Sequence, residues 1–293
     1  MQIHRTRARV YELIAFSLAA ISLCSHPKTI SAGEQRQSSP SPCDTSTLCP
    51  GEELVYEVSW LKVKLGQIQL KALESTTGAD GGVRYNCVAY VDSYDELPFV
   101  DVHAVSHTEM NARFFSTGFH AVEKKDDDRW LAEKSSYDLP HDLIVIEKGF
   151  QKEKNSPPFS SPTRDTVHLT EKPIQDGLSI FYFARANVQR RESITVPTVI
   201  YGKRGWMLLQ FSRVPAFEEI DALENQRVSV VQLDGKAEFR GMFGFTGKFR
   251  GWFSNDHAAI PIKAELEVTL GSVKLELVKW KRTGWSPPAI LKK

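Results

Sequence analysis

The chain has 293 residues, with 37 Lys and Arg against 36 Asp and Glu, which gives a net charge of +1. Hydrophobic residues make up 41% of the chain and charged residues 25%, a composition that excludes a disordered, collagen-like or coiled-coil protein. The balanced charge argues against a nucleic-acid-binding protein, and four cysteines are too few for a disulfide-rich scaffold.

Residues 1–32 predict a secretory signal peptide. Three arginines and no acidic residue lie within the first nine positions, and a mostly apolar run follows over 11–23. A basic start followed by a short apolar run is typical of such peptides, and the run is too short for a transmembrane helix. We therefore expect cleavage after Ala32 and export, with no membrane span in the mature protein. Lipidation at Cys24 and retention of the N-terminus as an anchor are the open alternatives.

Residues 33–50 predict a flexible leader. The segment is rich in Ser, Pro and Gln and nearly devoid of large apolar residues, so it buries too little surface to offset its ordering entropy. Cys43 and Cys49 lie within it, close enough in sequence to close a small loop. In an oxidising compartment this spacing predicts a disulfide between them.

Residues 51–281 predict a single β-rich domain, followed by a C-terminal tail at 282–293. Apolar and polar residues alternate with a period of two over many short segments, as from Leu54 to Trp60. Two such segments flank Gly271 and predict a hairpin. The pattern therefore indicates a mainly antiparallel sheet.

One segment, 177–187, predicts a helix with Asp176 as its cap. One face of this segment is largely aromatic, because Leu178, Phe181, Tyr182 and Arg185 follow one another at helical spacing. A lone amphipathic helix in a β-rich chain must bury this face against a sheet. We therefore expect an incomplete or open β-barrel with the helix across its mouth, and a β-sandwich is the competing architecture.

The segment 239–253 alternates in an unusual way, with Phe or Gly at every odd position. Strand geometry places these odd positions on one face, and its aromatic residues include Phe243, Phe245, Phe249 and Phe253. In one hypothesis they form, with Phe181 and Tyr182, the wall of a cavity for an apolar ligand. In the other they pack beneath the helix as core.

The sequence favours neither a metal site nor an enzyme. His103 and His107 lie in a segment with strand character, which would place them about 13 Å apart, too far to share one ion. Asp126–Asp128 lacks the spacing of a calcium loop and indicates a solvated turn. Motifs for nucleophilic catalysis, nucleotide binding and metalloprotease chemistry do not occur, so we expect no catalytic residues, no metal and no cofactor.

Three motifs, in the right order, resemble a bacterial exported family known as domain of unknown function, number 3108. They are Gly-Glu-Glu-Leu-Val-Tyr-Glu-Val-Ser-Trp at 51–60 with Gly66 beyond it, the helix segment 174–185, and Trp-Phe-Ser-Asn-Asp at 252–256 with Ile-Pro-Ile at 260–262. The resemblance implies a periplasmic protein, rich in β-structure, with the character of an incomplete barrel and no established catalytic residues. It also suggests a distant relation to lipoprotein-carrier half-barrels.

The function expected from these features is non-enzymatic. We expect a periplasmic protein of the bacterial envelope that binds a lipid, another apolar or amphipathic ligand, or an envelope protein on a concave β surface. The alternatives are a structural or protein-interaction module with a fully packed core, and an envelope hydrolase whose site is not visible in the sequence.

Overall fold

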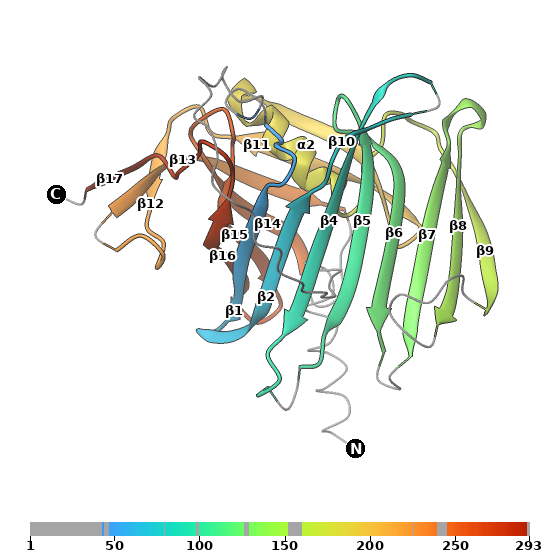
Figure 1. Cartoon of the computed structure of the whole chain (residues 1–293), viewed down its shortest axis with the longest axis horizontal. Coiled ribbons are helices and arrows are strands. Elements are labelled where there is room, and N and C mark those ends of the chain that lie inside the picture. Colours follow the sequence, from blue (N-terminus) through green and yellow to red (C-terminus); the bar gives the residue numbers. More distant parts are fainter. Residues whose placement is uncertain are drawn as a thin grey trace, which may run out of the picture.

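The computed structural model of the chain describes residue 43 and the ranges 47–78, 80–97, 100–125, 129–151, 160–224, 226–238 and 245–291, with the backbone alone at 160, 161 and 245. In this part of the chain one large sheet curls around one α-helix (Figure 1). The predicted signal peptide at 1–32 and the predicted turn at Asp126–Asp128 lie outside the described residues.

The strands before the helix are β1 (Glu53–Trp60), β2 (Val63–Ala72), β3 (Thr76–Thr77), β4 (Val83–Ser93), β5 (His103–Asn111), β6 (Ser116–Lys124), β7 (Trp130–Asp138), β8 (Leu143–Gln151) and β9 (Ser160–His168). The helix and the later strands are α2 (Ser179–Asn187), β10 (Ser193–Ile200), β11 (Lys203–Phe211), β12 (Ala216–Glu218), β13 (Gln226–Ala237), β14 (Phe245–Ser254), β15 (Pro261–Val268), β16 (Ser272–Lys281) and β17 (Ala289–Leu291). Short 3-10 helices are present at Leu139–His141 and Val188–Arg190.

The pairing of the strands defines a continuous antiparallel surface. Across the sheet the order is β9, β8, β7, β6, β5, β4, β2, β1, β16, β15, β14, β13, β11 and β10. β3 adds to β4, and β12 and β17 add to β13. Because β1 pairs with β16, strands from the two ends of the chain meet in the middle of the sheet.

The alternation in the sequence decides which side chains face the interior. In β1, Leu54, Tyr56 and Val58 are buried, and the residues between them are half-buried. The β15–β16 hairpin turns at Gly271, whose φ of 86° lies in the left-handed region that glycine adopts easily. The hairpin predicted around Gly271 is therefore confirmed.

The barrel is open, because no ladder joins β9 to β10 in the described part of the chain. Apolar side chains from β8, β9, β10 and the segment before α2 pack across this gap, namely Ile144, Ile146, Val167, Leu169, Ile174 and Val199. Gln175 adds a short parallel bridge to Thr198 of β10. The predicted fold class, an incomplete or open antiparallel barrel with one helix against it, is confirmed.

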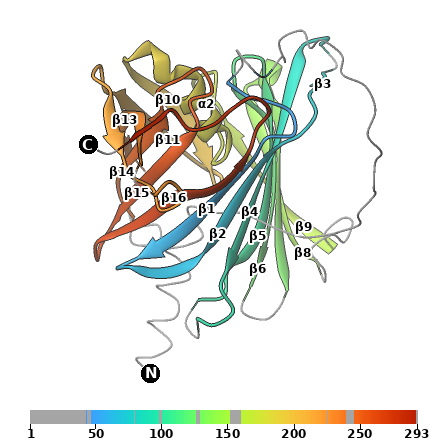
Figure 2. The ribbon, with the colours of Figure 1, turned by 60° about the vertical axis from the view of Figure 1, so that its left-hand side comes forward.

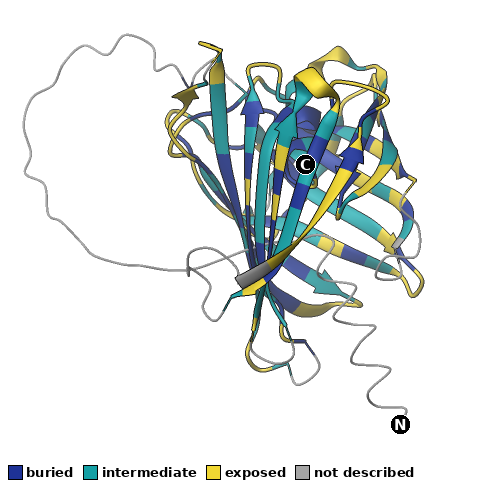
Figure 3. Cartoon of the chain, turned by 90° about the vertical axis from the view of Figure 1, so that its right-hand side faces the viewer, coloured by how far each residue is buried: buried dark blue, intermediate teal, exposed yellow. Residues whose placement is uncertain are grey.

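Helix α2 lies buried between the two halves of the sheet (Figures 2 and 3). The helix begins at Ser179 with Leu178 at its N-cap position, two residues later than the sequence predicts. Asp176 stabilises the turn that leads into it, because its Oδ1 accepts hydrogen bonds from the backbone N–H groups of Leu178 and Ser179, both at 2.7 Å. Tyr182 packs into a core cluster with β1, β2 and β4, whereas Phe183 packs into a second cluster with β10, β11 and β13. The helix is therefore apolar on two faces, where the sequence predicts one.

A buried ion-pair network connects α2 to both ends of the domain. Glu52 Oε1 lies 2.6 Å from Nη1 of Arg185, and Glu52 Oε2 lies 2.5 Å from Nη1 of Arg282. Arg185 also donates to the carbonyl oxygen of Thr47 at 2.7 Å, and Arg282 donates to that of Cys43 at 2.9 Å. All three charged residues are at most 7% exposed, so breaking the network would leave a charge buried without its partner.

The ordered domain extends beyond both of the boundaries that the sequence predicts, into the end of the leader and the start of the C-terminal tail. The predicted flexible leader extends to residue 50, but Leu48 and Cys49 are buried, and Cys49 forms a disulfide with Cys43, the pairing that the sequence predicts. The predicted tail at 282–293 begins with the buried Arg282 and continues into β17, which pairs with β13. Composition alone does not indicate these contacts, because their partners are distant in the sequence.

Candidate ligand pocket

A row of five inward-facing side chains crosses the concave face of the sheet on β2, β4, β5, β6 and β7. The register aligns Leu70 with Ala89, Ala89 with Ser106, Ser106 with Ala121, and Ala121 with Glu133. We call these five residues the floor row. Its three central members are small and lie on strands about 4.8 Å apart, so the middle of the row leaves space above the sheet.

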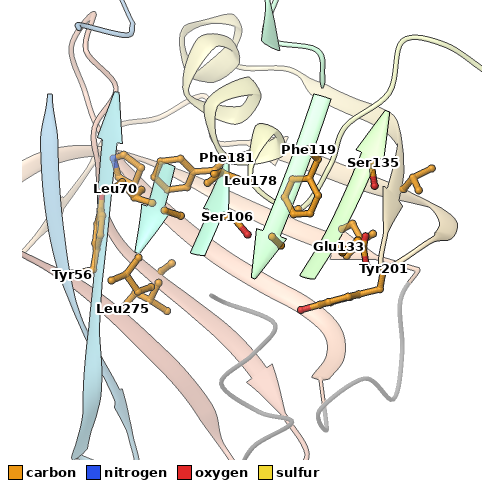
Figure 4. A pocket seen from close by; sticks show the side chains of 18 of the residues that line it. Tyr56, Leu70, Ser106, Phe119, Glu133, Ser135, Leu178, Phe181, Tyr201 and Leu275 are labelled. Atoms are coloured by element: carbon orange, nitrogen blue, oxygen red, sulfur yellow. The ribbon is translucent and has the colours of Figure 1, made fainter. Parts of the chain in front are cut away.

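Larger side chains surround the floor row and line a partly open pocket of about 160 Å³ (Figure 4). Tyr56 comes from β1 and Leu275 from β16, Leu178 and Phe181 lie at and just after the N-cap of α2, and Tyr201 lies in the turn after β10. Most of the wall is apolar. The volume is close to the roughly 150 Å³ of an apolar cavity that holds benzene, so one ring or a short piece of alkyl chain fits inside. Because the pocket is partly open, the rest of a larger guest can extend out of its mouth.

Two hydroxyl groups in the wall are buried and have no hydrogen-bond partner among the described residues. They are Oγ of Ser106, in the floor row, and the phenol of Tyr56. Each residue is only 3% exposed. Burial raises the pKa of Tyr56, and this outweighs the opposite effect of the Arg185 charge, so the phenol stays neutral. Buried polar groups are nearly always paired, and these two exceptions belong to residues that line the same pocket.

The two charged residues in the described wall, Glu133 and Lys263, are both ion-paired. Glu133 lies 2.8 Å from Nζ of Lys148, and Lys263 lies 3.3 Å from Glu276 and 3.6 Å from Glu218. These pairs offset each charge locally. The pocket therefore offers neutral hydroxyl groups and apolar surface, which suit an uncharged guest better than an ionic one.

Other titratable groups close to the interior are held in neutral or fully bonded forms. Burial raises the pKa of Cys87 to about 12, so its thiol stays protonated and a poor nucleophile. Burial also raises the pKa of Asp176, although hydrogen bonds from Ser116, Thr108 and the helix N-terminus oppose this shift. The Asp176 carboxyl group is thereby committed to organising the start of α2.

The structure separates the residues that the sequence proposes as ligand-binding. Phe181 lines the pocket, and its ring stands edge-on to that of Tyr56 with the centroids 6.5 Å apart. Tyr182 is 1% exposed and belongs to the core cluster beside the pocket. Phe243 lies outside the described residues, and only the backbone of Phe245 is described.

The described side chains of the β14 aromatic stripe lie in the second core cluster, away from the pocket. Phe253 is 4% exposed and stands edge-on to Phe211 of β11, with the ring centroids 6.4 Å apart. The ring of Phe249 lies so close over Gly235 of β13 that a Cβ atom there would collide with it. The packed-core hypothesis therefore describes these two side chains, and the cavity lies on the other side of α2.

The histidines of β5 lie on a strand, as predicted. Nδ1 of His103 is 2.6 Å from a carboxylate oxygen of Asp92, and this hydrogen bond raises the pKa of His103. His107 faces His120 across the β5–β6 ladder, and burial lowers the pKa of both. Within the described ranges, no three His, Cys, Asp or Glu side chains are placed to hold one metal ion.

Sequence reasoning missed Ala89, Ser106 and Ala121. None of them stands out within its own strand, because small residues are common in sheets. Only the register of successive ladders shows that they share one row, so the available signal was the relative alignment of four strands.

An open antiparallel barrel with an internal pocket places the molecule among β-barrel-like proteins. The chain belongs to the family described as "Protein of unknown function (DUF3108)", whose model matches residues 55–278. This confirms the family that the three sequence motifs predict.

Two solved structures are similar to the chain. One is a beta-barrel-like protein of domain of unknown function DUF1849 from Brucella abortus, with 13% identity, a TM-score of 0.49, and coverage of 78% of this chain and 96% of that chain. The other is a protein with a YmcC-like fold from Bacteroides fragilis, with 7% identity, a TM-score of 0.31, and coverage of 82% of this chain and 100% of that chain. No curated protein matches the chain in sequence. In the described ranges, no helix is long and apolar enough to cross a bilayer.

Proposed function

We propose that this protein binds an apolar or amphipathic small molecule above the floor row and catalyses no reaction on it. The observation that carries the proposal is the hollow: three small side chains in one row beneath an apolar wall leave about 160 Å³ unfilled. Protein interiors are close-packed, so an apolar hollow of this size departs from the packing of the rest of the core. An apolar occupant is favoured because it removes the wall of this partly open hollow from water.

Binding without chemistry agrees with the state of the groups around the pocket. The Glu133 carboxylate is ion-paired, the Asp176 carboxyl group stabilises the turn that leads into α2, and the Cys87 thiol is protonated. Each is therefore held in a form that suits structure better than proton transfer or nucleophilic attack.

The proposed place of action is the periplasm of a bacterial envelope. The basic and then apolar sequence at 1–32 supports export. The disulfide between Cys43 and Cys49 supports an oxidising compartment, because such bonds are rare in the cytosol.

Two adjacent serines of β7 provide a matched test. Ser135 lines the pocket and is 6% exposed, whereas Ser136 is exposed on the opposite face of the same strand. The probe is N-phenyl-1-naphthylamine, a neutral dye whose emission rises in an apolar site. We expect saturable binding by the wild type and by Ser136→Leu, and at least about tenfold weaker binding by Ser135→Leu, because the added side chain takes up the cavity.

Absence of saturable binding by the folded wild type, or equal binding by the two leucine variants, contradicts the proposal. Native mass spectrometry of protein purified from the periplasm separates the alternatives. Co-purified lipid supports a ligand carrier, and a stable protein partner on an empty pocket supports an interaction module. Turnover of an ester or peptide panel supports a hydrolase.

A further inference from the structure

Ser106 lies in the middle of the floor row. Leu70 is two strands away on one side and Glu133 is two strands away on the other, so each end of the row is about 10 Å from Ser106. Figure 4 shows the Ser106 side chain within the pocket, on the central strand of the row. A group bound at Ser106 would therefore have space for an extended molecule on either side.

The buried Ser106 hydroxyl group lowers the stability of the folded protein. It is buried and has no hydrogen-bond partner among the described residues, and such a group loses its bonds to water without replacement. The neighbouring positions of the row, Ala89 and Ala121, carry no polar atom. Alanine at position 106 would fit the same row without this cost, so the hydroxyl is explained by a partner that enters the pocket.

The chemistry of the wall restricts that partner. On the Leu70 side the pocket is apolar, with Leu275 and Tyr56 in its wall. The charges of Glu133 and Lys263 are already paired, so a carboxylate at the centre would lose its hydration and gain no free cation among the described lining residues. A neutral carbonyl group can accept a hydrogen bond from a serine hydroxyl without this penalty.

We propose that Ser106 determines specificity by donating a hydrogen bond to the neutral carbonyl of an ester- or amide-linked acyl chain whose apolar arm lies toward Leu70. This inference rests on the proposed function, because it assigns the ligand class of the same pocket. Ser106 acts as a recognition residue: its Oγ has no histidine or carboxylate bonded to it in the described structure, so no base is in place to take its proton.

The test measures how methyl decanoate and sodium decanoate displace N-phenyl-1-naphthylamine from the wild type, Ser106→Ala and the exposed control Ser136→Ala. We expect the ester to compete at a concentration at least about tenfold lower than the carboxylate. In Ser106→Ala the ester should bind about threefold to tenfold more weakly, whereas the dye should bind within about twofold of the wild type. Ser136→Ala should match the wild type with all three probes.

A thermal melt separates recognition from a structural role. Because the Ser106 hydroxyl has no protein partner to lose, Ser106→Ala should melt at the wild-type temperature or above it. A lower melting temperature, unchanged ester affinity, or stronger competition by decanoate overturns the inference. So does hydrolysis of the ester that depends on Ser106, which would make this residue a nucleophile.

The dye distinguishes this failure from failure of the proposed function. If the wild type binds the dye and Ser135→Leu does not, the pocket binds ligands whatever Ser106 does. If the wild type binds neither dye nor ester, the proposed function and this inference fail together.

Discussion

The two sides of α2 fill their interior space in opposite ways. On the side of β10, β11, β13 and β14, large aromatic residues such as Phe211 and Phe253 interlock and leave a closed core. On the side of β4, β5 and β6, the residues in equivalent inward positions are Ala89, Ser106 and Ala121, and a hollow remains above them. Both regions belong to the same sheet and contact the same helix.

The size of the inward-facing side chains decides which part of this sheet can hold a ligand. An aromatic stripe along one strand marks volume that is already occupied. Small residues that share one row across several strands mark volume that the protein leaves open. The alternating aromatic residues, which stand out in the sequence, therefore lie in the packed core. The small residues of the floor row, which do not stand out, form the pocket.

The largest effect on stability should come from removing an aromatic ring from the packed core on the β14 side of α2. Phe253→Ala removes a ring that is 4% exposed and packs against Phe211, so it should lower the free energy of unfolding by about 3–5 kcal/mol. Urea denaturation measures this loss. Phe217→Ala, at a ring that is 47% exposed, should cost far less, about 0.5 kcal/mol. Similar losses for the two variants would contradict the assignment of Phe253 to the core.

The next largest effect on stability should come from breaking the buried ion pairs between Glu52 and the two arginines, one of which belongs to α2. Glu52→Gln leaves Arg185 and Arg282 facing a neutral amide in a buried site, and we expect a loss of about 3 kcal/mol in unfolding free energy. Glu53→Gln is the matched control, because Glu53 is 32% exposed and forms longer ion pairs with lysines, which are worth about 1 kcal/mol or less. Equal denaturation midpoints for the two variants would show that the network does not hold α2.

The smallest effect should come from the histidines of β5, whose side chains lie on the face of the sheet opposite the pocket. They should change how the stability of the protein depends on pH. The pKa of His103 is raised by its hydrogen bond with Asp92, so its contribution is complete below about pH 6.5 and is lost as the pH rises through its raised pKa. His103→Gln should therefore lower the melting temperature more at about pH 5.5 than at about pH 8.5.

His107 should show the opposite sign. Burial lowers its pKa, so protonation favours unfolding as the pH falls below about 6.5. His107→Gln should then stabilise the protein relative to the wild type at low pH. Melting curves of His107→Gln and the wild type at about pH 5.5 and about pH 8.5 measure this difference. A lower melting temperature of His107→Gln than of the wild type at the lower pH would contradict the expected sign.

The sequence predicts much of this fold for local reasons. Alternation along the strands, a helix that ends at Asn187 and the turn at Gly271 are properties of short segments, and each is confirmed. The gap between β9 and β10 also agrees with the predicted open barrel. Features that depend on distant partners were missed, such as the burial of Arg282 in the predicted tail.

The site was predicted less well than the fold, for a physical reason. The proposed concave surface beside α2 and the residue Phe181 correspond to the observed pocket, but Phe249 and Phe253 do not line it. The alternation within a strand shows which face a side chain occupies, but it does not show whether the space above that face is filled by other side chains. Whether it is filled depends on the register between neighbouring strands. A β-bulge between Glu109 and Met110 shifts the β5–β6 register, and the sequence of one strand alone does not reveal this shift.

The most direct test of the contrast between the two sides of α2 enlarges a small side chain on the pocket side and shortens a large one on the aromatic side. Ala121→Leu fills the floor row, and Phe253→Leu trims the aromatic core while keeping it apolar. The measurement is the dissociation constant of N-phenyl-1-naphthylamine for each folded variant and for the wild type. We expect at least about tenfold weaker binding for Ala121→Leu and a dissociation constant within about twofold of the wild type for Phe253→Leu. Retained binding in Ala121→Leu together with lost binding in Phe253→Leu would place the ligand on the aromatic side and contradict a pocket above the floor row.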